Sequence, residues 1–334
     1  MKRLILDIDS VGDDILALLY CAKEKTLKLE GVTTVIGASG SIEQATKVAL
    51  NTLSIANCQD IPVYKGAERP IIGHPKEIME KPVKINEELK DIFGDRIKGF
   101  NPPAKKPNHK EQDKHAIDFI IETVMSNPNE ISIVATGPLT NIGMAILQEP
   151  KLSENIKECY IMGGVFKTSG NMTPVVEYNI WNDPEAAKIV FNSGTPITLI
   201  PLDICEDNSA ADSMFTRDDI FDLSLMNNNK VASYIVDFLP LYIDIWREYF
   251  KLVGFPMDDV ITAAILVDDS LCKMTDRVYV DVETEGELTR GQCIAFFGNQ
   301  ILVKPEKKNT RICTSVDGLK FKNMFKYTIS LYSN

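Results

Sequence analysis

Several features that define other protein classes are missing from this 334-residue chain. No apolar run approaches the roughly 18 residues that a transmembrane helix needs, so a membrane-spanning protein is not expected. A formal net charge of −11 leaves no basic excess, which argues against binding to nucleic acid or to an anionic membrane. The seven cysteines are scattered and never form a CxxC pair, which argues against a zinc site and against a disulfide framework.

The lack of a signal-peptide pattern and the small number of histidines bear on the location and the chemistry of the protein. The first ten residues, MKRLILDIDS, turn acidic at Asp7, too early for the apolar region of a signal peptide. Together with the unpaired cysteines, this predicts a cytoplasmic protein. The chain has three histidines, His74, His109 and His115, and we expect each to be a surface residue rather than a catalyst.

What the sequence does contain is an alternation of apolar, β-rich runs with helical patterns. The expected strands lie at 4–9, 29–37, 61–66, 131–137, 158–164 and 196–203. The expected helices lie at 14–23, 42–56, 114–126, 139–147 and 184–192. Continuous apolar strands that alternate with helices predict an α/β fold with a doubly wound, mostly parallel, Rossmann-like central sheet.

Three segments depart from this alternation. Residues 73–113 are polar and hold five prolines, and we interpret them as a long surface excursion that can serve as an active-site flap. Residues 214–271 are mostly helical in pattern and include the aromatic stretch YIVDFLPLYIDIWREYF. From residue 278 the tail reads as strands, at 278–284, 292–297, 300–303 and 311–316. No repeat is present, so we expect a single domain over residues 1–334 with helical and loop insertions.

Four acids crowd the join between the first strand and the first helix: Asp7, Asp9, Asp13 and Asp14. A helix N-terminus favours a negative charge by about 0.3–1 kcal/mol, which is too little to offset repulsion among close carboxylates in a water-poor pocket. A bound divalent cation would offset it, and oxygen ligands suit Ca²⁺ or Mg²⁺. The alternative is local: Asp13 caps the helix and Asp14 is a solvated first-turn acid.

The acidic segment resembles two enzyme motifs. DIDSV (residues 7–11) resembles the loop of haloacid-dehalogenase-type phosphatases, in which the first acid, here Asp7, is the nucleophile and Mg²⁺ is the cofactor. DIDSVGDD (residues 7–14) resembles the DxDxxxDD loop of the inosine–uridine nucleoside hydrolase family. A phosphatase also needs a downstream lysine and a second acidic loop, and GDRIK at 94–98 matches these poorly.

Four further segments resemble the nucleoside hydrolase family in the right order. They are TGPLTN within 132–145, IMGG at 161–164, the block GNMTPVVEYN…DPEAA within 170–203, and PMDDVITAA, which stands where the family has HDPxxxA. The resemblance runs from residue 1 to about residue 320. It implies hydrolysis of the N-glycosidic bond of ribonucleosides, with Ca²⁺ as cofactor, a free nucleoside or a related N-riboside as substrate, a role in purine or pyrimidine salvage, and a homodimer or homotetramer.

The resemblance also assigns roles by motif position. It implies that the ion is held by Asp9, Asp14, the main-chain carbonyl of Thr136, and Asp258. Asp9 would in addition take the proton from the attacking water. The implied substrate-binding residues are Asp13, Met162, Asn171, Glu177, Asn179 and Asp258.

Local chemistry leaves alternatives open for some of these residues. Glu177 and Asn179 are two apart, so in an extended segment they would point the same way toward a sugar. Asn171 and Asn179 are also typical of turns and caps beside the prolines of this block. Met162, at a strand end, is equally compatible with ordinary core packing.

The chain departs from the family pattern at two positions. Met257 stands where many members have a His that assists departure of the base, and a thioether cannot donate a proton. Ala38 stands where an Asn would contact the water or the sugar, and Ser39 or Ser41 are candidate substitutes. These departures leave a second hypothesis open: a nucleoside- or ribose-binding protein of the same fold that has lost turnover.

Aromatic residues offer another way to activate the leaving base. Trp246, our candidate base-binding residue, lies with Tyr242, Tyr249 and Phe250 in the helical segment just before Met257. The resemblance implies this route, because some purine-preferring members of the family lack the His and stack the base between aromatic rings, which raises its basicity so that solvent can protonate it. The alternative is that these aromatic residues form the ordinary apolar face of a helix.

Overall fold

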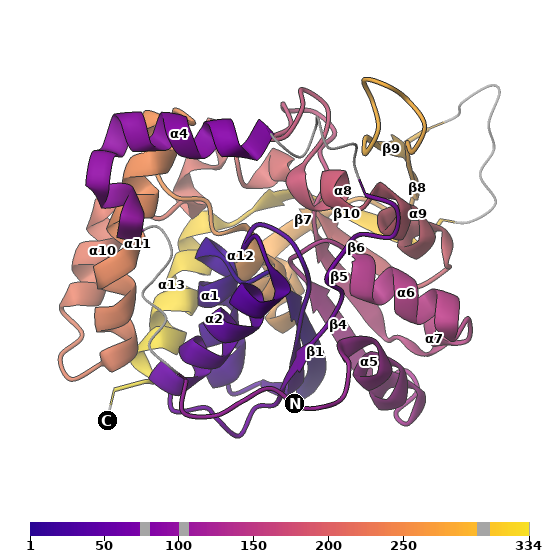
Figure 1. The fold of residues 1–334 in the computed structure, drawn as a ribbon, viewed down its shortest axis with the longest axis horizontal. Helices are drawn as coiled ribbons and strands as arrows, with labels where there is room; N and C mark the ends of the chain where they lie inside the picture. The colour runs from indigo at the N-terminus through magenta and orange to yellow at the C-terminus, as the bar shows by residue number, and fades with distance from the viewer. Residues whose placement is uncertain (74–80, 100–106, 299–307, 334) are drawn as a thin grey trace.

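The computed structural model describes residues 1–73, 81–99, 107–298 and 308–333, and the expected strand at 300–303 and His74 lie outside these ranges. A single eight-stranded sheet forms the centre of the fold (Figure 1). Its strands, in spatial order, are β3 (Val63–Lys65), β2 (Leu27–Thr34), β1 (Lys2–Ile8), β4 (Ile131–Ala135), β5 (Glu158–Met162), β6 (Ile197–Ile200), β10 (Thr310–Val316) and β7 (Cys272–Met274). Only the pairing of β7 with β10 is antiparallel, so the expected mostly parallel sheet is confirmed.

Helices cover both faces of this sheet. Within β1, Leu4 and Leu6 belong to one buried cluster and Ile5 to the other, because successive strand residues point to opposite faces. The first face is covered by α1 (Gly12–Lys23), α2 (Ile42–Ile55), α10 (Arg217–Ser224), α11 (Lys230–Glu248), α12 (Asp258–Val267) and α13 (Gly318–Ser330). The second face is covered by α5 (Ala116–Met125), α6 (Thr140–Gln148), α7 (Leu152–Asn155) and α9 (Pro184–Asn192), with the hairpin β8 (Tyr279–Val282) and β9 (Cys293–Phe296).

Two expectations about insertions and the tail need correction. The tail does not consist of strands alone, because it ends in the 13-residue helix α13. Phe321, Phe325 and Ile329 recur four residues apart and are buried, which is a helical period. The polar excursion is not only a loop, because it contains α4 (Lys81–Phe93) and the 3₁₀ segment η1 (Gly94–Gly99).

The helix α4 lies against α11. Leu89 and Phe93, four residues apart on α4, pack with Leu241 and Ile245 of α11. At the polar rim of this contact, Arg96 of η1 donates to the carboxylate of Asp244 at 2.5 Å. None of the helices in the described ranges is long and apolar enough to cross a membrane.

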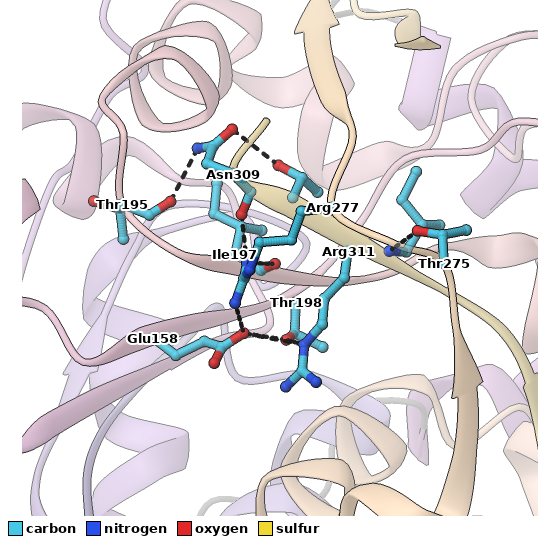
Figure 2. Close-up of polar contacts among 10 residues, drawn as sticks. Glu158, Thr195, Ile197, Thr198, Thr275, Arg277, Asn309 and Arg311 are labelled. Carbon is cyan, nitrogen blue, oxygen red and sulfur yellow. Dashed lines mark hydrogen bonds and ion pairs between the residues drawn. The ribbon is translucent and has the colours of Figure 1, made fainter. Parts of the chain in front are cut away.

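At the amino-terminal edge of the sheet, a polar network joins β5, β6 and β10 (Figure 2). Glu158, the first residue of β5, accepts hydrogen bonds from Thr198 Oγ1 at 2.5 Å and from Arg311 Nε at 3.2 Å. Arg277 donates to the same carboxylate and to the main-chain oxygens of Ile197 and Asn309. The network therefore holds three strands together on the side of the sheet opposite their carboxyl ends.

We expect Arg277→Ala to lower stability by about 1 kcal/mol without changing catalysis, because it removes hydrogen bonds to two main-chain oxygens and to Glu158 at a partly exposed site. Thermal denaturation together with steady-state kinetics would test this. Lys157→Ala, which removes an equal charge from an exposed neighbouring position, is the matched control. Equal denaturation midpoints for Arg277→Ala and the control would contradict the prediction.

Candidate functional site

The expected site residues gather where neighbouring parallel strands end. Asp9 follows β1, Thr136 follows β4, Met162 ends β5, and Asp258 opens α12. Carboxyl ends of parallel strands meet at one edge of a sheet, which is where doubly wound folds bind ligands. Residues from four separate parts of the chain therefore reach one place.

Asp9 is enclosed by two glycine-containing loops. The amide of Ala38 donates to its Oδ2 at 2.7 Å. A Cβ atom on Gly37 would lie 2.0 Å from that oxygen, and one on Gly137 would lie 3.0 Å from the Asp9 nitrogen. Both loops can approach the carboxylate this closely only because these residues lack side chains. Burial raises the pKa of Asp9 above its usual value.

Asp14 faces Asp9 from the first turn of α1. It accepts hydrogen bonds from Thr136 Oγ1 at 2.6 Å and from the amide of Val11 at 3.0 Å. Burial, followed by the charge of Asp9, raises the pKa of Asp14 well above its usual value. The local alternative is wrong for Asp14, which is 1% exposed rather than solvated, and for Asp13, since Val11 is the N-cap residue.

Asp13 lies in the first turn of α1, and Asp258 is the first residue of α12. The amide of Asp259 donates to Asp13 Oδ2 at 3.1 Å, and burial raises the pKa of Asp13 to about 6. Asp258 is 5% exposed, and its Oδ1 is buried with no hydrogen-bond partner among the described residues. Burial, with the charges of Glu206 and Asp13, raises the pKa of Asp258 well above its usual value, while the nearby Cys205 thiol opposes the shift.

This arrangement has the chemistry of a site for a hard cation. It combines the two neighbouring buried carboxyl groups of Asp9 and Asp14 with a buried Asp258 oxygen that has no hydrogen-bond donor among the described residues, and a divalent ion would relieve both. Among the described residues, however, no three Asp, Glu, His or Cys side chains already surround one ion position. The chemistry of this donor set nevertheless fits a hard metal ion.

On the other side of the site, Glu177 caps the short helix α8 (Tyr178–Asn182). Its carboxylate accepts from the amides of Asn179, Ile180 and Gly164, at 2.5, 3.1 and 3.0 Å. Burial raises the pKa of Glu177 to about 7. The expectation of an extended segment is therefore wrong, since Glu177 and Asn179 belong to a helix N-terminus.

The two asparagines make structural hydrogen bonds at the same place. Asn179 Nδ2 donates to the carbonyl oxygen of Thr136 at 2.9 Å and to that of Met162 at 3.3 Å. Asn171 Oδ1 accepts from the amide of Tyr178 at 2.9 Å. Asn171 thus performs the cap and turn chemistry that was the alternative. Asn179 instead joins the ends of β4 and β5 through two long-range hydrogen bonds beside the predicted ligands. Met162 is 5% exposed and lies against Val165 and Leu202.

Asp7 lies below the site and is fully buried. Its Oδ1 accepts from Thr33 Oγ1 at 2.5 Å and from Asn141 Nδ2 at 2.8 Å, which fastens the ends of β1 and β2 to α6. A phosphatase nucleophile must meet its substrate directly. The position of Asp7 therefore argues against the phosphatase alternative.

The residues considered as replacements for the missing His and Asn, and Met257 itself, are engaged in packing or in hydrogen bonds elsewhere. Met257 is fully buried in the core. Ser39 Oγ donates to the main-chain oxygen of Ser41, and Ser41 Oγ accepts from the Gln44 amide at the start of α2. His115 caps α5, and His109 lies beside Ser54. The structure shows no replacement for the missing imidazole among these residues.

The aromatic residues of α11 form one cluster. Trp246 has ring centroids of Phe255 and Phe250 at 5.1 Å and that of Tyr242 at 6.1 Å. Tyr242 is buried against Gly12, whose φ of +37° turns the chain into α1. Tyr249 instead donates to Glu88 of α4. Packing thus accounts for Tyr242, whereas Trp246 is partly exposed at the edge of the cluster.

Sequence reasoning missed two acids of the site. Asp259 follows the expected ligand Asp258, and Glu206 follows β6 and the 3₁₀ turn η2 (Leu202–Ile204). Glu206 accepts from Asn171 Nδ2 at 3.4 Å. Its place just after an apolar strand was the available signal, since such positions lie at the ligand-binding edge.

Comparison with known proteins agrees with this geometry. The family model "Inosine-uridine preferring nucleoside hydrolase" matches residues 4–323. The protein of that name from Crithidia fasciculata is 31% identical over 321 residues, covering 96% of this chain and 95% of its own. The pyrimidine-specific ribonucleoside hydrolase RihB of Shigella flexneri is 28% identical over 324 residues, covering 95% and 93%.

A search of solved structures gives the same result. A purine-preferring ribonucleoside hydrolase from Gardnerella vaginalis superposes with a TM-score of 0.84 at 28% identity, covering 99% of each chain. The match extends over the sheet, the helices and the loops that carry the acids. The chain therefore belongs to the inosine-uridine preferring nucleoside hydrolase family.

Proposed function

We propose that the protein hydrolyses the N-glycosidic bond of a ribonucleoside, or of a related N-riboside, to free base and ribose with the help of Ca²⁺. The observation that carries the proposal is the buried Oδ1 of Asp258, which has no hydrogen-bond donor among the described residues, together with the buried neighbouring carboxyl groups of Asp9 and Asp14. Buried carboxylates with this arrangement are costly unless a cation binds them. Family membership supplies the reaction class.

The ion would be held by the carboxylates of Asp9, Asp14 and Asp258 and by the carbonyl oxygen of Thr136. That carbonyl already accepts from Asn179, and its second lone pair would face the ion. When bound, Ca²⁺ lowers the pKa of a coordinated water. Asp9 would take the proton of that water, from a position fixed by the Ala38 amide.

The ribose would be held by the remaining acids and amides. Asp13 and Asp258 would bind its hydroxyls from the α12 side, and Asn171, Glu177 and Asn179 from the α8 side. Met162 would lie beneath the ring and Trp246 beside the base. A site lined by carboxylates favours the positive charge that develops on the sugar as the bond breaks.

Ribose release from a panel containing inosine, guanosine, adenosine, uridine and cytidine tests the proposal. Activity should disappear with a chelator and return with added Ca²⁺. If none of these nucleosides, and no other N-riboside, yields ribose, the proposal fails.

The burial of Met257 favours one alternative, a binding protein that has lost turnover, because no described histidine takes the place of the usual one. Calorimetry with ribose and with inosine separates the two. Tight binding without product supports the alternative, and measurable turnover excludes it.

We also propose that the enzyme works in the cytoplasm in purine or pyrimidine salvage, as a homodimer or homotetramer. Free cysteines support a reducing compartment. Light scattering of the purified protein would give its mass in solution, and a monomer would contradict the assembly.

The amide of Asp259 offers a specific test of how Asp13 is positioned. Asp259→Pro removes the N–H that donates to Asp13, and proline is tolerated in the first turn of a helix. Loss of one hydrogen bond to a charged group costs about 1.5–3 kcal/mol, so we expect kcat/KM to fall about 10–100-fold. Asp259→Ala keeps the N–H and is the control for loss of the side chain. Equal kinetics for the two variants would show that the amide does not position Asp13.

A further inference from the structure

Glu206 is an acid of the site to which the resemblance gives no role. It follows η2 at the carboxyl end of β6 and is partly buried. The reaction needs a proton for the departing base, yet Met257 occupies the position of the usual His and is buried in the core. Glu206 is therefore a candidate for that missing step.

The contacts of Glu206 place it between the sugar side and the base side of the site. From the sugar side, Asn171 Nδ2 donates to its Oε2 at 3.4 Å. From the base side, the buried indole N–H of Trp246 has no acceptor in hydrogen-bond geometry among the described residues, yet it lies near enough to lower the pKa of Glu206. A glycosidic bond joins sugar to base, so an acid between these two residues lies where that bond would break.

The electrostatic surroundings favour a protonated carboxyl. Burial, then the charges of Glu177 before α8 and Asp13 of α1, raise the pKa of Glu206 to about 7, while Asn171 and Trp246 oppose the shift. Asp258 of α12 is also close enough for Glu206 to raise its pKa. These neighbours are acidic or neutral, so they favour the protonated form of the Glu206 carboxyl group.

We propose that Glu206 is the general acid that protonates the leaving base, in place of the histidine that the chain lacks. As the bond between C1′ and the base nitrogen breaks, its electron pair moves to the base, and the Glu206 O–H transfers its proton to a base nitrogen. The attacking water loses a proton to Asp9 and adds its oxygen to C1′. Solvent returns a proton to Glu206 and removes one from Asp9, so the net reaction is nucleoside plus water to base plus ribose. This inference rests on the proposed function.

The test compares two leaving groups in the wild type and in Glu206→Gln. Inosine requires protonation of its base, whereas 4-nitrophenyl β-D-ribofuranoside releases a stable anion that needs no proton. General acid catalysis contributes about 10²–10⁴-fold, so we expect kcat on inosine to fall by that factor in Glu206→Gln. On the nitrophenyl riboside, kcat should change by less than about fivefold, since only the proton donor is lost. If the wild type prefers another nucleoside of the panel, that nucleoside replaces inosine.

The pH profile gives a second readout. The wild type should lose kcat on the nucleoside as pH rises through the pKa of Glu206, because the acid form is the active one, and this limb should be absent in Glu206→Gln. Glu154→Gln, an equal charge change on the exposed surface of α7, is the control and should match the wild type on both substrates.

Each outcome decides the matter. Equal losses on both substrates, or no loss on the nucleoside, would overturn the role of Glu206 while leaving nucleoside hydrolysis intact. If the wild type cleaves the nitrophenyl riboside but no nucleoside, Glu206 does not act as a general acid, and the proposal is refuted. Cleavage of neither substrate would refute the proposed function itself.

Discussion

Asp9→Asn should lower kcat about 10²–10⁴-fold, because the variant loses the base that accepts the proton of the water. The fold should survive the change. The Ala38 amide can donate to the asparagine oxygen as it does to Asp9 Oδ2, and the glycines on either side tolerate an isosteric group. Steady-state kinetics at saturating Ca²⁺ would measure the loss, and circular dichroism would verify the fold.

Asp7→Asn separates this mechanism from the phosphatase alternative. Asp7 is buried and bonded to Thr33 and Asn141, so its replacement should affect the denaturation midpoint more than kcat. Asp276→Asn, at an exposed position, controls for the change of charge. A variant at Asp7 that is inactive, with Asp9→Asn still active, would reverse the roles assigned to the two residues.

The second large effect is expected for Asp258→Asn, which should make the metal-free protein more stable but make the enzyme inactive. Asp258→Asn removes a buried charge whose Oδ1 lacks a partner, so the metal-free variant should denature at a higher temperature than the wild type. The same change should abolish turnover. It should also abolish most of the stabilisation by added Ca²⁺, which for the wild type grows with the logarithm of ion concentration. Differential scanning fluorimetry with and without Ca²⁺ measures both effects.

The sign of the pH dependence follows from the same burial. Asp13 has a pKa raised to about 6, and Asp7 and Glu177 have pKa values raised to about 7. The native state therefore holds more protons than the unfolded state between about pH 4 and 7, and the contribution of these acids to stability falls as pH rises through that range. A metal-free wild type whose stability rises from pH 5 to pH 8, or that is unaffected by Ca²⁺, would contradict this account.

The sequence predicted the six leading strands and the five helices between them, because each is a continuous apolar run or a clear helical period. It missed α13, whose buried Phe321, Phe325 and Ile329 follow a tail of strands, and α4, whose described buried side chains, Leu89 and Phe93, lie within a polar segment. Local patterns are weak where tertiary contact supplies most of the stability of an element. The family and the enzyme class that the motifs indicated are confirmed by the matches to known proteins.

The sequence alone could predict a site residue only where that residue occupies a position of a family motif. The amide of Asp259 meets Asp13 across 246 residues, a contact that no local pattern contains. Glu177 and Asn179 were expected in an extended segment because five residues of helix, α8, are too short to show a period. Glu206 has no motif counterpart, and its neighbours Asn171 and Trp246 come from distant elements.

The docking of α4 onto α11 has a consequence for how such enzymes diverge. The acids expected to bind the ion and the sugar are held by main-chain amides at the end of a rigid sheet, at Ala38, Val11 and Asp259. The aromatic cluster around Trp246 is instead supported by α11, onto which α4 and η1 dock through apolar side chains, the Arg96–Asp244 ion pair and the Tyr249–Glu88 hydrogen bond. The two parts meet where Tyr242 packs against Gly12, just before Asp13 and Asp14. Under the proposed function, substitutions in the aromatic cluster away from Tyr242 would alter base recognition while the same acids continue to hold the ribose.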